Sequence, residues 1–323
     1  MNHRILSIVL PTVLIASLVM LGNPAPAAEN APAAKAKGPV KVFILAGQSN
    51  MQGQGRIKMD PRRNEGKGTL EYMVKKSDKT DRFRHLVDAK GDWVVRDDVW
   101  IWYLGRKGGL TAGYGANENV IGPELQFGHV VGDHFDNQVL LIKIAWGGRS
   151  LAKDFRPPSS GGEVGKNYTE LIKLTKDVLE NLKTHFPEYD GRGWEIAGIG
   201  WHQGWNDRVN QAFNDAYEEN MANFIRDVRK ELGVKDLPFV IAETGMSGHK
   251  ETHPRALSLM KAQAAVAKRK EFQGNVAFVG TKDYFRPKEE SPSGQAYHWN
   301  QNAETYFLIG DGMGEAMKKL LKR

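Results

Sequence analysis

The sequence of 323 residues contains no cysteine. This absence excludes a thiol nucleophile, thiolate metal sites, disulfides and a bacterial N-terminus that is lipid-modified on cysteine. The glycine pairs at 108–109 and 161–162 lack the Lys-Ser/Thr of a phosphate-binding loop, and no Gly-x-Gly-x-x-Gly follows an apolar run. The histidine spacings match no zinc motif. We therefore expect an activity that needs neither a cofactor nor a metal.

Long apolar runs are almost as scarce, and the one at 5–21 follows Arg4 and is broken by Pro11. Small residues at 25–28 then supply a cleavage site, so the segment is typical of a secretory signal peptide. A transmembrane anchor is the alternative, but the run lies at or below the roughly 17 residues needed to span a bilayer. We predict a signal peptide over 1–28, a linker over 29–39, and a secreted or periplasmic domain over 40–323 that does not contact the membrane after cleavage.

The formal net charge is +7, but basic and acidic residues are interleaved along the chain. Such dispersion is typical of a solvated surface rather than of a nucleic-acid interface, so we expect no nucleic-acid partner. The sequence carries no signal for an oligomeric state.

Short, continuously apolar runs alternate with helical patterns along the domain. Continuous apolarity predicts strands that are buried on both faces, as in a parallel sheet. The predicted strands cover 42–46, 139–145, 196–201, 238–242 and 276–280. One predicted helix begins at 122–124, and the others cover 168–185, 213–232, 255–270 and 303–322. This order predicts a three-layer α/β/α sandwich with a central, mostly parallel five-stranded sheet, whose site lies beyond the carboxyl ends of the strands.

A polar, glycine-rich segment at about 54–119 interrupts the alternation. It contains two apolar pieces, 93–95 and 99–103, which resemble a small hairpin. We interpret the segment as an insertion within one domain that contributes to the rim of the site.

Ser49 follows the first predicted strand directly, in Gly-Gln-Ser-Asn-Met at 47–51. A serine on a tight turn at a strand end would present its hydroxyl, and its backbone N–H, to the crevice. The alternative is that Ser49 merely caps the next helix, because serine is a favoured N-cap residue. The neighbouring amides of Gln48 and Asn50, crowded at the same strand end, favour a site.

Three further segments follow predicted strands or precede the last helix. They are Trp-Gly-Gly-Arg-Ser at 146–150, Trp-His-Gln-Gly-Trp-Asn-Asp at 201–207, and Tyr-His-Trp-Asn at 297–300. Glycines after a strand allow the backbone to approach a substrate oxygen, and an imidazole is the usual base for a serine nucleophile. Taken singly, each segment has a simpler interpretation: an ordinary glycine turn at 146–150, a tryptophan packed in the core at 201–207, and a structural or exposed histidine at 297–300.

Together with the serine motif, these segments resemble the sequence blocks of the SGNH hydrolases, in the sialate O-acetylesterase-like branch that includes acetyl xylan esterases. The resemblance covers nearly all of the chain from residue 40. It implies Ser49 as nucleophile and His298 as base. It also implies an oxyanion hole formed by the N–H groups of Ser49 and Gly148 (or Gly147) and by the side chain of Gln203. The flanking residues that we expect to contact substrate are Gln48, Asn50, Trp146, Arg149, His202, Trp205 and Trp299.

The sequence departs from the family pattern at two positions. Trp205 replaces the usual glutamate, and Gln295 replaces the aspartate found three residues before the histidine in many members. We expect that Gln295, as an amide, can neither orient the imidazole nor balance its positive charge as a carboxylate would, so the acid must come from elsewhere or be absent. Glu243, at the end of the fourth predicted strand, is the first candidate, Asp283 is the alternative, and a Ser-His dyad is the third possibility.

We therefore predict a secreted carbohydrate O-acetylesterase that acts on an acetylated polysaccharide or sugar. A non-catalytic carbohydrate-binding protein on a decayed esterase scaffold is the main alternative, motivated by Gln295 and Trp205. A lipase or thioesterase would need a broad apolar groove, which motifs rich in tryptophan and amides do not favour. The glycan and the acetyl position are not specified by the sequence.

Overall fold

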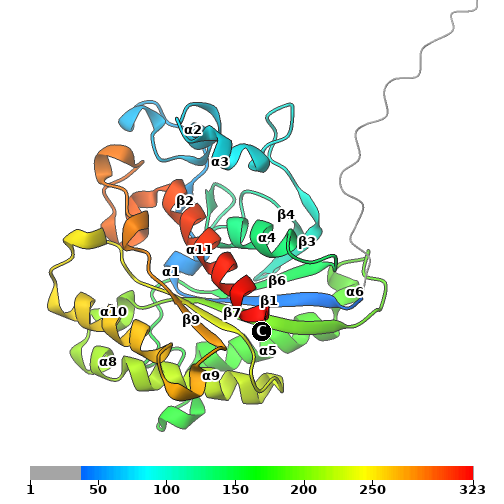
Figure 1. Ribbon diagram of the computed structural model, residues 1–323, viewed down its shortest axis with the longest axis vertical. Helices are drawn as coiled ribbons and strands as arrows, with labels where there is room; N and C mark the ends of the chain where they lie inside the picture. Colours follow the sequence, from blue (N-terminus) through cyan, green and yellow to red (C-terminus); the bar gives the residue numbers. More distant parts are fainter. Residues whose placement is uncertain (1–37, 323) are drawn as a thin grey trace, which may run out of the picture. The chain divides into compact units, whose positions relative to one another are not determined.

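The computed structural model describes residues 38–322. Within this range, seven strands form one sheet in the order β4-β3-β6-β1-β7-β8-β9 (Figure 1). Every neighbouring pair is parallel except β3 and β4. The strands are β1 (Val40–Gly47), β3 (Arg96–Tyr103), β4 (Arg106–Leu110), β6 (Val139–Ala145), β7 (Trp194–His202), β8 (Phe239–Ala242) and β9 (Val276–Val279).

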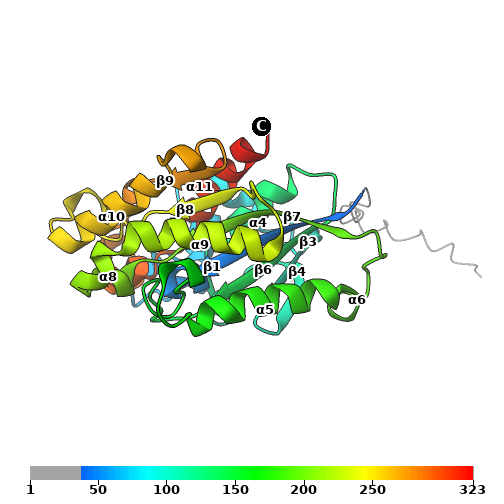
Figure 2. The same cartoon turned by 90° about the horizontal axis from the view of Figure 1, so that it is seen from below.

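Helices cover both faces of the sheet, with α5 and α9 on one side and α4 and α11 on the other (Figure 2). The larger helices are α4 (Glu124–Gly132), α5 (Lys166–Glu180), α9 (Tyr217–Leu232), α10 (Pro254–Val266) and α11 (Ala303–Leu321). The shorter ones are α1 (Ser49–Gln52), α2 (Leu70–Lys75), α3 (Thr80–Phe83), α6 (Leu182–His185), α7 (Trp205–Arg208) and α8 (Gln211–Asp215). The architecture is an α/β/α sandwich, as predicted.

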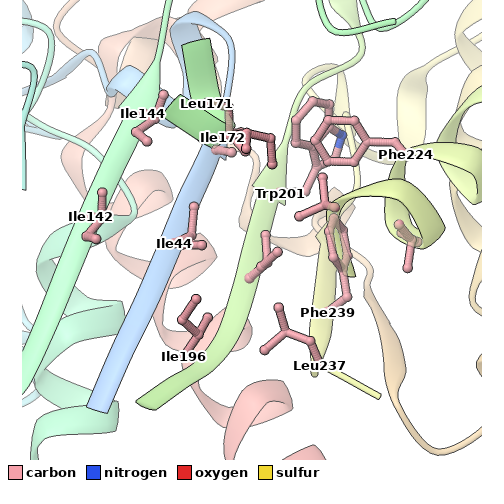
Figure 3. Close-up of a cluster of buried hydrophobic side chains, with 14 of the residues drawn as sticks. Ile44, Ile142, Ile144, Leu171, Ile172, Ile196, Trp201, Phe224, Leu237 and Phe239 are labelled. Atoms are coloured by element: carbon pink, nitrogen blue, oxygen red, sulfur yellow. The ribbon is translucent and has the colours of Figure 1, made fainter. Parts of the chain in front are cut away.

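The continuous apolarity of the central strands follows from these two covers. Along β1, Val42 and Ile44 pack into the core beneath α5 and α9, whereas Phe43 and Leu45 pack into the core beneath α4 and α11. Figure 3 shows the first of these cores, where the aromatic rings of Trp201 and Phe224 lie beside aliphatic strand residues. Over residues 42–46 neither face of β1 meets water, and every side chain in this stretch is apolar.

The five predicted strands are confirmed as β1, β6, β7, β8 and β9, but the sheet has two more. The inserted segment supplies them: β3 pairs in parallel with β6, and β4 returns beside β3. The expected hairpin between 93–95 and 99–103 is wrong, because the second piece pairs with β4. Leu104 and Gly105 form the two-residue connection, and both have positive φ (45° and 94°), the conformation of tight hairpin turns. A leucine at such a position gave no turn signal.

The predicted helices are present, with breaks that the apolar pattern did not reveal. The pattern at 168–185 divides into α5 and α6, and the pattern at 213–232 divides into α8 and α9. In the described residues, no helix combines the length and apolarity that membrane crossing requires. The predicted signal peptide and most of the predicted linker lie outside the described residues, and β1 begins at Val40.

Candidate functional site

The sheet register brings three of the sequence blocks to one edge. Gly47, the last residue of β1, pairs with Ala145 at the end of β6 and with His202 at the end of β7. The segments that follow these strands therefore begin side by side, at the carboxyl ends of the parallel strands. This edge carries an open pocket of about 360 Å³. Its lining residues are Gln48, Ser49, Gln52, Gln54, Gly147, Gly148, Trp205, Asn206, Tyr297 and His298.

Ser49 is the first residue of α1 and is half-buried at the pocket wall. The N-cap position belongs to Gln48, so the interpretation of Ser49 as a helix cap is wrong. Gly47 permits the sharp transition from strand to helix, because a Cβ at this position would lie 2.3 Å from the carbonyl oxygen of His202. The local chain path thus holds the Ser49 side chain at the pocket rather than in the core.

The glycine turn after β6 lies beside Ser49. A Cβ on Gly147 would be 3.9 Å from Cβ of Ser49, and Gly148 has φ +68°, a conformation that favours glycine. Both glycines line the pocket, so their backbone can approach a bound oxygen.

A buried carboxylate anchors the residues just after this glycine turn to the segment after β7. The side chain of Asp207 accepts hydrogen bonds from the backbone N–H groups of Leu151 (2.7 Å) and Ala152 (2.9 Å), and from Nε2 of Gln203 (2.6 Å). Burial raises the pKa of Asp207 to about 6, while the three hydrogen bonds act in the opposite direction. Asp207 therefore fixes two loops of the site relative to each other.

The expected role of Gln203 in an oxyanion hole is not supported. Its side chain is buried, and its amide N–H groups already serve the Arg149 carbonyl (2.9 Å) and the Asp207 carboxylate. Asn206 lines the pocket instead, and its Nδ2 donates to the carbonyl of Gly148 at 2.9 Å. An amide nitrogen carries two hydrogens, so Asn206 retains a second donor for a ligand.

His298 enters the pocket from the loop before α11. Its Nδ1 lies 3.2 Å from Oε1 of Gln295. The Gln295 amide is itself oriented, because its Nε2 lies 2.5 Å from the hydroxyl of Tyr297 and its Oε1 accepts from Gln301 at 3.1 Å. An amide oxygen can only accept, so Nδ1 carries the proton and Nε2 is free to act as a base. Burial lowers the pKa of His298 below its usual value near 6.5.

Both predicted acids, Glu243 and Asp283, bond to other residues. The prediction that Gln295 cannot orient the imidazole is wrong, because its amide oxygen contacts Nδ1 of His298. Glu243 accepts from the backbone N–H of Thr281 at 2.9 Å and pairs with Lys282 at 3.6 Å. The exposed Asp283 contacts Nε2 of His249 at 2.7 Å. The partner of the His298 ring is an uncharged amide, which leaves the dyad as the arrangement closest to the observed geometry.

Several expected substrate contacts are structural. His202 and Trp299 are fully buried in the core, with their rings 6.4 Å apart. Burial lowers the pKa of His202 to about 4, so this ring is neutral. Asn50 is buried too: its Nδ2 donates to the carbonyl of Tyr297, and its Oδ1 accepts from Tyr306. Asn50 thereby connects the serine turn with the histidine loop.

Gln48 lines the pocket but also braces it, since its Nε2 donates to Oδ1 of Asn206 and its Oε1 accepts from the N–H of Gly204. Trp146 and Arg149 lie outside the pocket lining; Trp146 packs on Phe155 in the core. Of the seven residues that we expected to contact substrate, only Gln48 and Trp205 therefore line the pocket.

Four pocket residues were missed by sequence reasoning: Gln52, Gln54, Asn206 and Tyr297. Asn206 and Tyr297 stand next to Trp205 and His298, so their positions within the blocks were a usable signal. Trp205 and Tyr297 form an aromatic wall with ring centroids 5.6 Å apart, and the Arg208 guanidinium lies 4.4 Å from the Trp205 ring. Over residues 38–322, no three His, Asp or Glu side chains form a cluster suited to a metal ion.

Comparison with known proteins places the chain in a family. A sequence profile of the carbohydrate esterases described as sialic acid-specific acetylesterases matches residues 39–319. A probable carbohydrate esterase of Arabidopsis thaliana is 22% identical over 202 residues, which make up 62% of this chain and 68% of that protein.

Two solved structures share the fold. The X-ray structure of an Arabidopsis thaliana protein has a TM-score of 0.57 at 17% identity, over 87% of this chain and 98% of that one. The crystal structure of a novel carbohydrate acetylesterase from Xanthomonas citri has a TM-score of 0.52 at 14% identity, over 87% of this chain and 56% of that one. Because the family profile spans almost all of the described chain, the protein belongs to the sialic acid-specific acetylesterase family of carbohydrate esterases.

Proposed function

We propose that this carbohydrate esterase is a secreted serine O-acetylesterase in which Ser49 is the nucleophile and His298 the general base. The observation that carries the proposal is the common pocket. Ser49, Gly148, Asn206 and His298 come from four separate segments of the chain and line the same cavity. A hydroxyl, an imidazole and N–H donors around one small space are the parts that acyl transfer requires.

In the proposed reaction, Nε2 of His298 takes the proton of Ser49 as Oγ bonds to the carbonyl carbon of the acetyl ester. The carbonyl oxygen becomes an oxyanion that accepts from the N–H groups of Ser49 and Gly148 and from the amide of Asn206. When the tetrahedral intermediate collapses, the carbon–oxygen bond to the sugar breaks and His298 protonates the departing alcohol. Water, activated by the same imidazole, then hydrolyses the acetyl-enzyme and releases acetate.

The chemistry of the pocket wall supports a carbohydrate as the alcohol. Trp205 and Tyr297 offer flat aromatic surfaces against which a sugar ring can stack, and Gln52 and Gln54 offer amides for hydroxyl groups. A lipase or thioesterase would need a wide apolar groove, whereas this lining is rich in amides. Secretion remains a proposal from the N-terminal sequence.

The direct test is acetate release from a panel of acetylated xylan, acetylated pectin and O-acetylated sialic acid. We expect the wild-type protein to release acetate from at least one of them and Ser49→Ala to release none above background. Saturable glycan binding, without acetate release and without labelling of Ser49 by an organophosphonate, would instead favour the binding-protein alternative.

Asn206→Ala is expected to lower kcat about 10²- to 10³-fold, which is the usual effect of removing one oxyanion donor. The measurement is 4-nitrophenyl acetate hydrolysis, with thermal unfolding to verify the fold. Gln211→Ala is a suitable control, since Gln211 is an exposed neighbour on α8 that pairs with Asp215. An unchanged kcat for Asn206→Ala would remove Asn206 from the mechanism.

The pH dependence of kcat/KM should follow His298, which must be neutral to accept a proton. Burial lowers its pKa, so activity should persist below pH 6.5 and fall only at more acidic pH. Gln295→Glu keeps the shape of the side chain and places a carboxylate against Nδ1, which raises the pKa of the imidazole. The acid limb of the variant should therefore move to higher pH. An unmoved limb would show that Gln295 does not contact the base.

A further inference from the structure

A fully buried ion pair lies directly behind the serine turn. Lys143 of β6 and Glu124, the first residue of α4, are 2.7 Å apart, and neither side chain is exposed to solvent. Oε1 of Glu124 also accepts from the N–H of Gly122 at 2.8 Å. Neither residue belongs to the sequence blocks around the pocket, and the proposed reaction steps do not use either of them.

The remaining donors of the Lys143 ammonium reach two other segments. Nζ donates to the backbone carbonyl of Gln52 at 2.6 Å and to that of Tyr114 at 2.7 Å. Gln52 is the last residue of α1, the helix that starts with Ser49. The three hydrogen bonds satisfy all three ammonium protons and tie α1 to the inserted segment and to α4.

The side chain of Gln52 is held as well. Its Nε2 donates to the hydroxyl of Tyr103 on β3 at 2.9 Å, and Nζ of Lys143 lies 4.6 Å from the centre of the Tyr103 ring. On the pocket side, a Cβ on Gly147 would lie only 3.0 Å from Oε1 of Gln52. Lys143 and Tyr103 thus fix both the backbone and the side chain of the residue that ends the serine helix, next to the glycine turn.

We propose that Lys143 and Glu124 are positioning residues for ester hydrolysis: they hold the carboxyl end of α1 so that Ser49 keeps its place beside the glycine turn. The inference rests on the proposed function of Ser49. It also gives the inserted segment a role, because Tyr103 and Tyr114 supply part of the same support.

Stability alone does not account for this pair. Removing two charges from water is costly, and apolar side chains of similar volume often stabilise a fold as well or better. Burial lowers the pKa of Lys143 to about 8, so the ammonium is still largely charged at neutral pH and the pair persists there. What apolar replacements cannot supply is the directed donation to the Gln52 carbonyl.

The test is the double variant Lys143→Met/Glu124→Gln, which removes both charges together and leaves an amide oxygen for the N–H of Gly122. We expect its melting temperature to remain near that of the wild type. We expect kcat for 4-nitrophenyl acetate to fall about 10- to 100-fold, because small misplacements of a nucleophile have effects of this size. KM should change little, and organophosphonate labelling of Ser49 should slow by a similar factor.

The matched control is Arg96→Met/Asp98→Asn, which removes another largely buried ion pair. This pair lies at the start of β3, whereas Tyr103 lies at its end. This control is expected to keep kcat even where it loses stability. If the wild type hydrolyses the ester and the Lys143/Glu124 variant keeps its kcat, the inference is overturned. If the wild type hydrolyses no ester, the proposed function fails instead.

Should the double variant not fold, Tyr103→Phe decides the question. It keeps the aromatic ring over Lys143 and removes the hydroxyl that holds Gln52, so kcat should fall about fivefold, as for the loss of one hydrogen bond. An unchanged kcat in a folded Tyr103→Phe protein would overturn the inference.

Discussion

Ser49→Ala is expected to lower kcat for 4-nitrophenyl acetate by about 10⁴-fold or more, because it removes the hydroxyl that forms the acetyl-enzyme in the proposed mechanism. The fold should survive, since Ser49 is half-buried at the first position of a helix, where alanine is well tolerated. The measurements are steady-state hydrolysis, thermal unfolding and mass spectrometry after organophosphonate treatment. Wild-type protein should gain one adduct at Ser49, and the variant none.

The control for this experiment is Ser77→Ala, a half-buried serine in the inserted segment whose hydroxyl hydrogen-bonds to Asp78. Its kcat should match that of the wild type. If Ser49→Ala retained more than a tenth of the wild-type kcat, Ser49 would not be the nucleophile, and the pocket would need another explanation.

His298→Ala is expected to cost about as much as Ser49→Ala, because nucleophile and base act as one unit and removing either stops the same step. Glu243→Gln should behave very differently. Its carboxylate faces the N–H of Thr281 and the ammonium of Lys282. We therefore expect kcat to change less than about threefold, together with a loss of stability from the disrupted buried contacts.

Both variants can be measured with 4-nitrophenyl acetate at pH 8, where an unprotonated imidazole is ensured. Asp283→Asn should likewise leave kcat close to the wild-type value, because Asp283 pairs with His249 at the surface. A loss in Glu243→Gln as large as that in His298→Ala would restore Glu243 as the acid and would require movement of the loop before α11.

The fold was predictable because its signals are local. The run 42–46 is apolar on both faces, and that pattern alone specifies a strand covered by helices on two sides. Strand β3 was harder to predict, because its partner β6 lies far along the sequence and the turn that joins β3 to β4 contains Leu104 with positive φ. Nothing in a leucine indicates a left-handed backbone.

The sequence predicted which segments of the chain form the site, but it predicted less well which single side chains in those segments face the pocket. Gln203 and Asn206 are three residues apart and carry the same functional group, yet the first turns into the core and the second toward the pocket. The two tryptophans differ in the same way: Trp299 is buried in the core, whereas Trp205 lines the pocket. Which of two similar side chains faces a pocket depends on backbone angles and packing partners that lie far away in the sequence.

The partner of the imidazole was misjudged for a related reason. A carboxylate was sought because charge balance suggested one, whereas the loop folds so that the adjacent Gln295 supplies orientation without charge. The prediction of an acid at a strand end assumed that Glu243 has no other partner, but its carboxylate bonds to the N–H of Thr281 and to the ammonium of Lys282.

The carboxylate of Asp207 has a consequence for any attempt to redesign this enzyme. This single side chain bonds to Leu151 and Ala152, just after the glycine turn, and to Gln203 in the segment that carries Asn206. Mutations in these two loops should therefore show non-additive effects in double-mutant cycles. Directed evolution toward a bulkier acyl group would then have to alter both loops in concert, and libraries that randomise either loop alone would mostly yield inactive proteins.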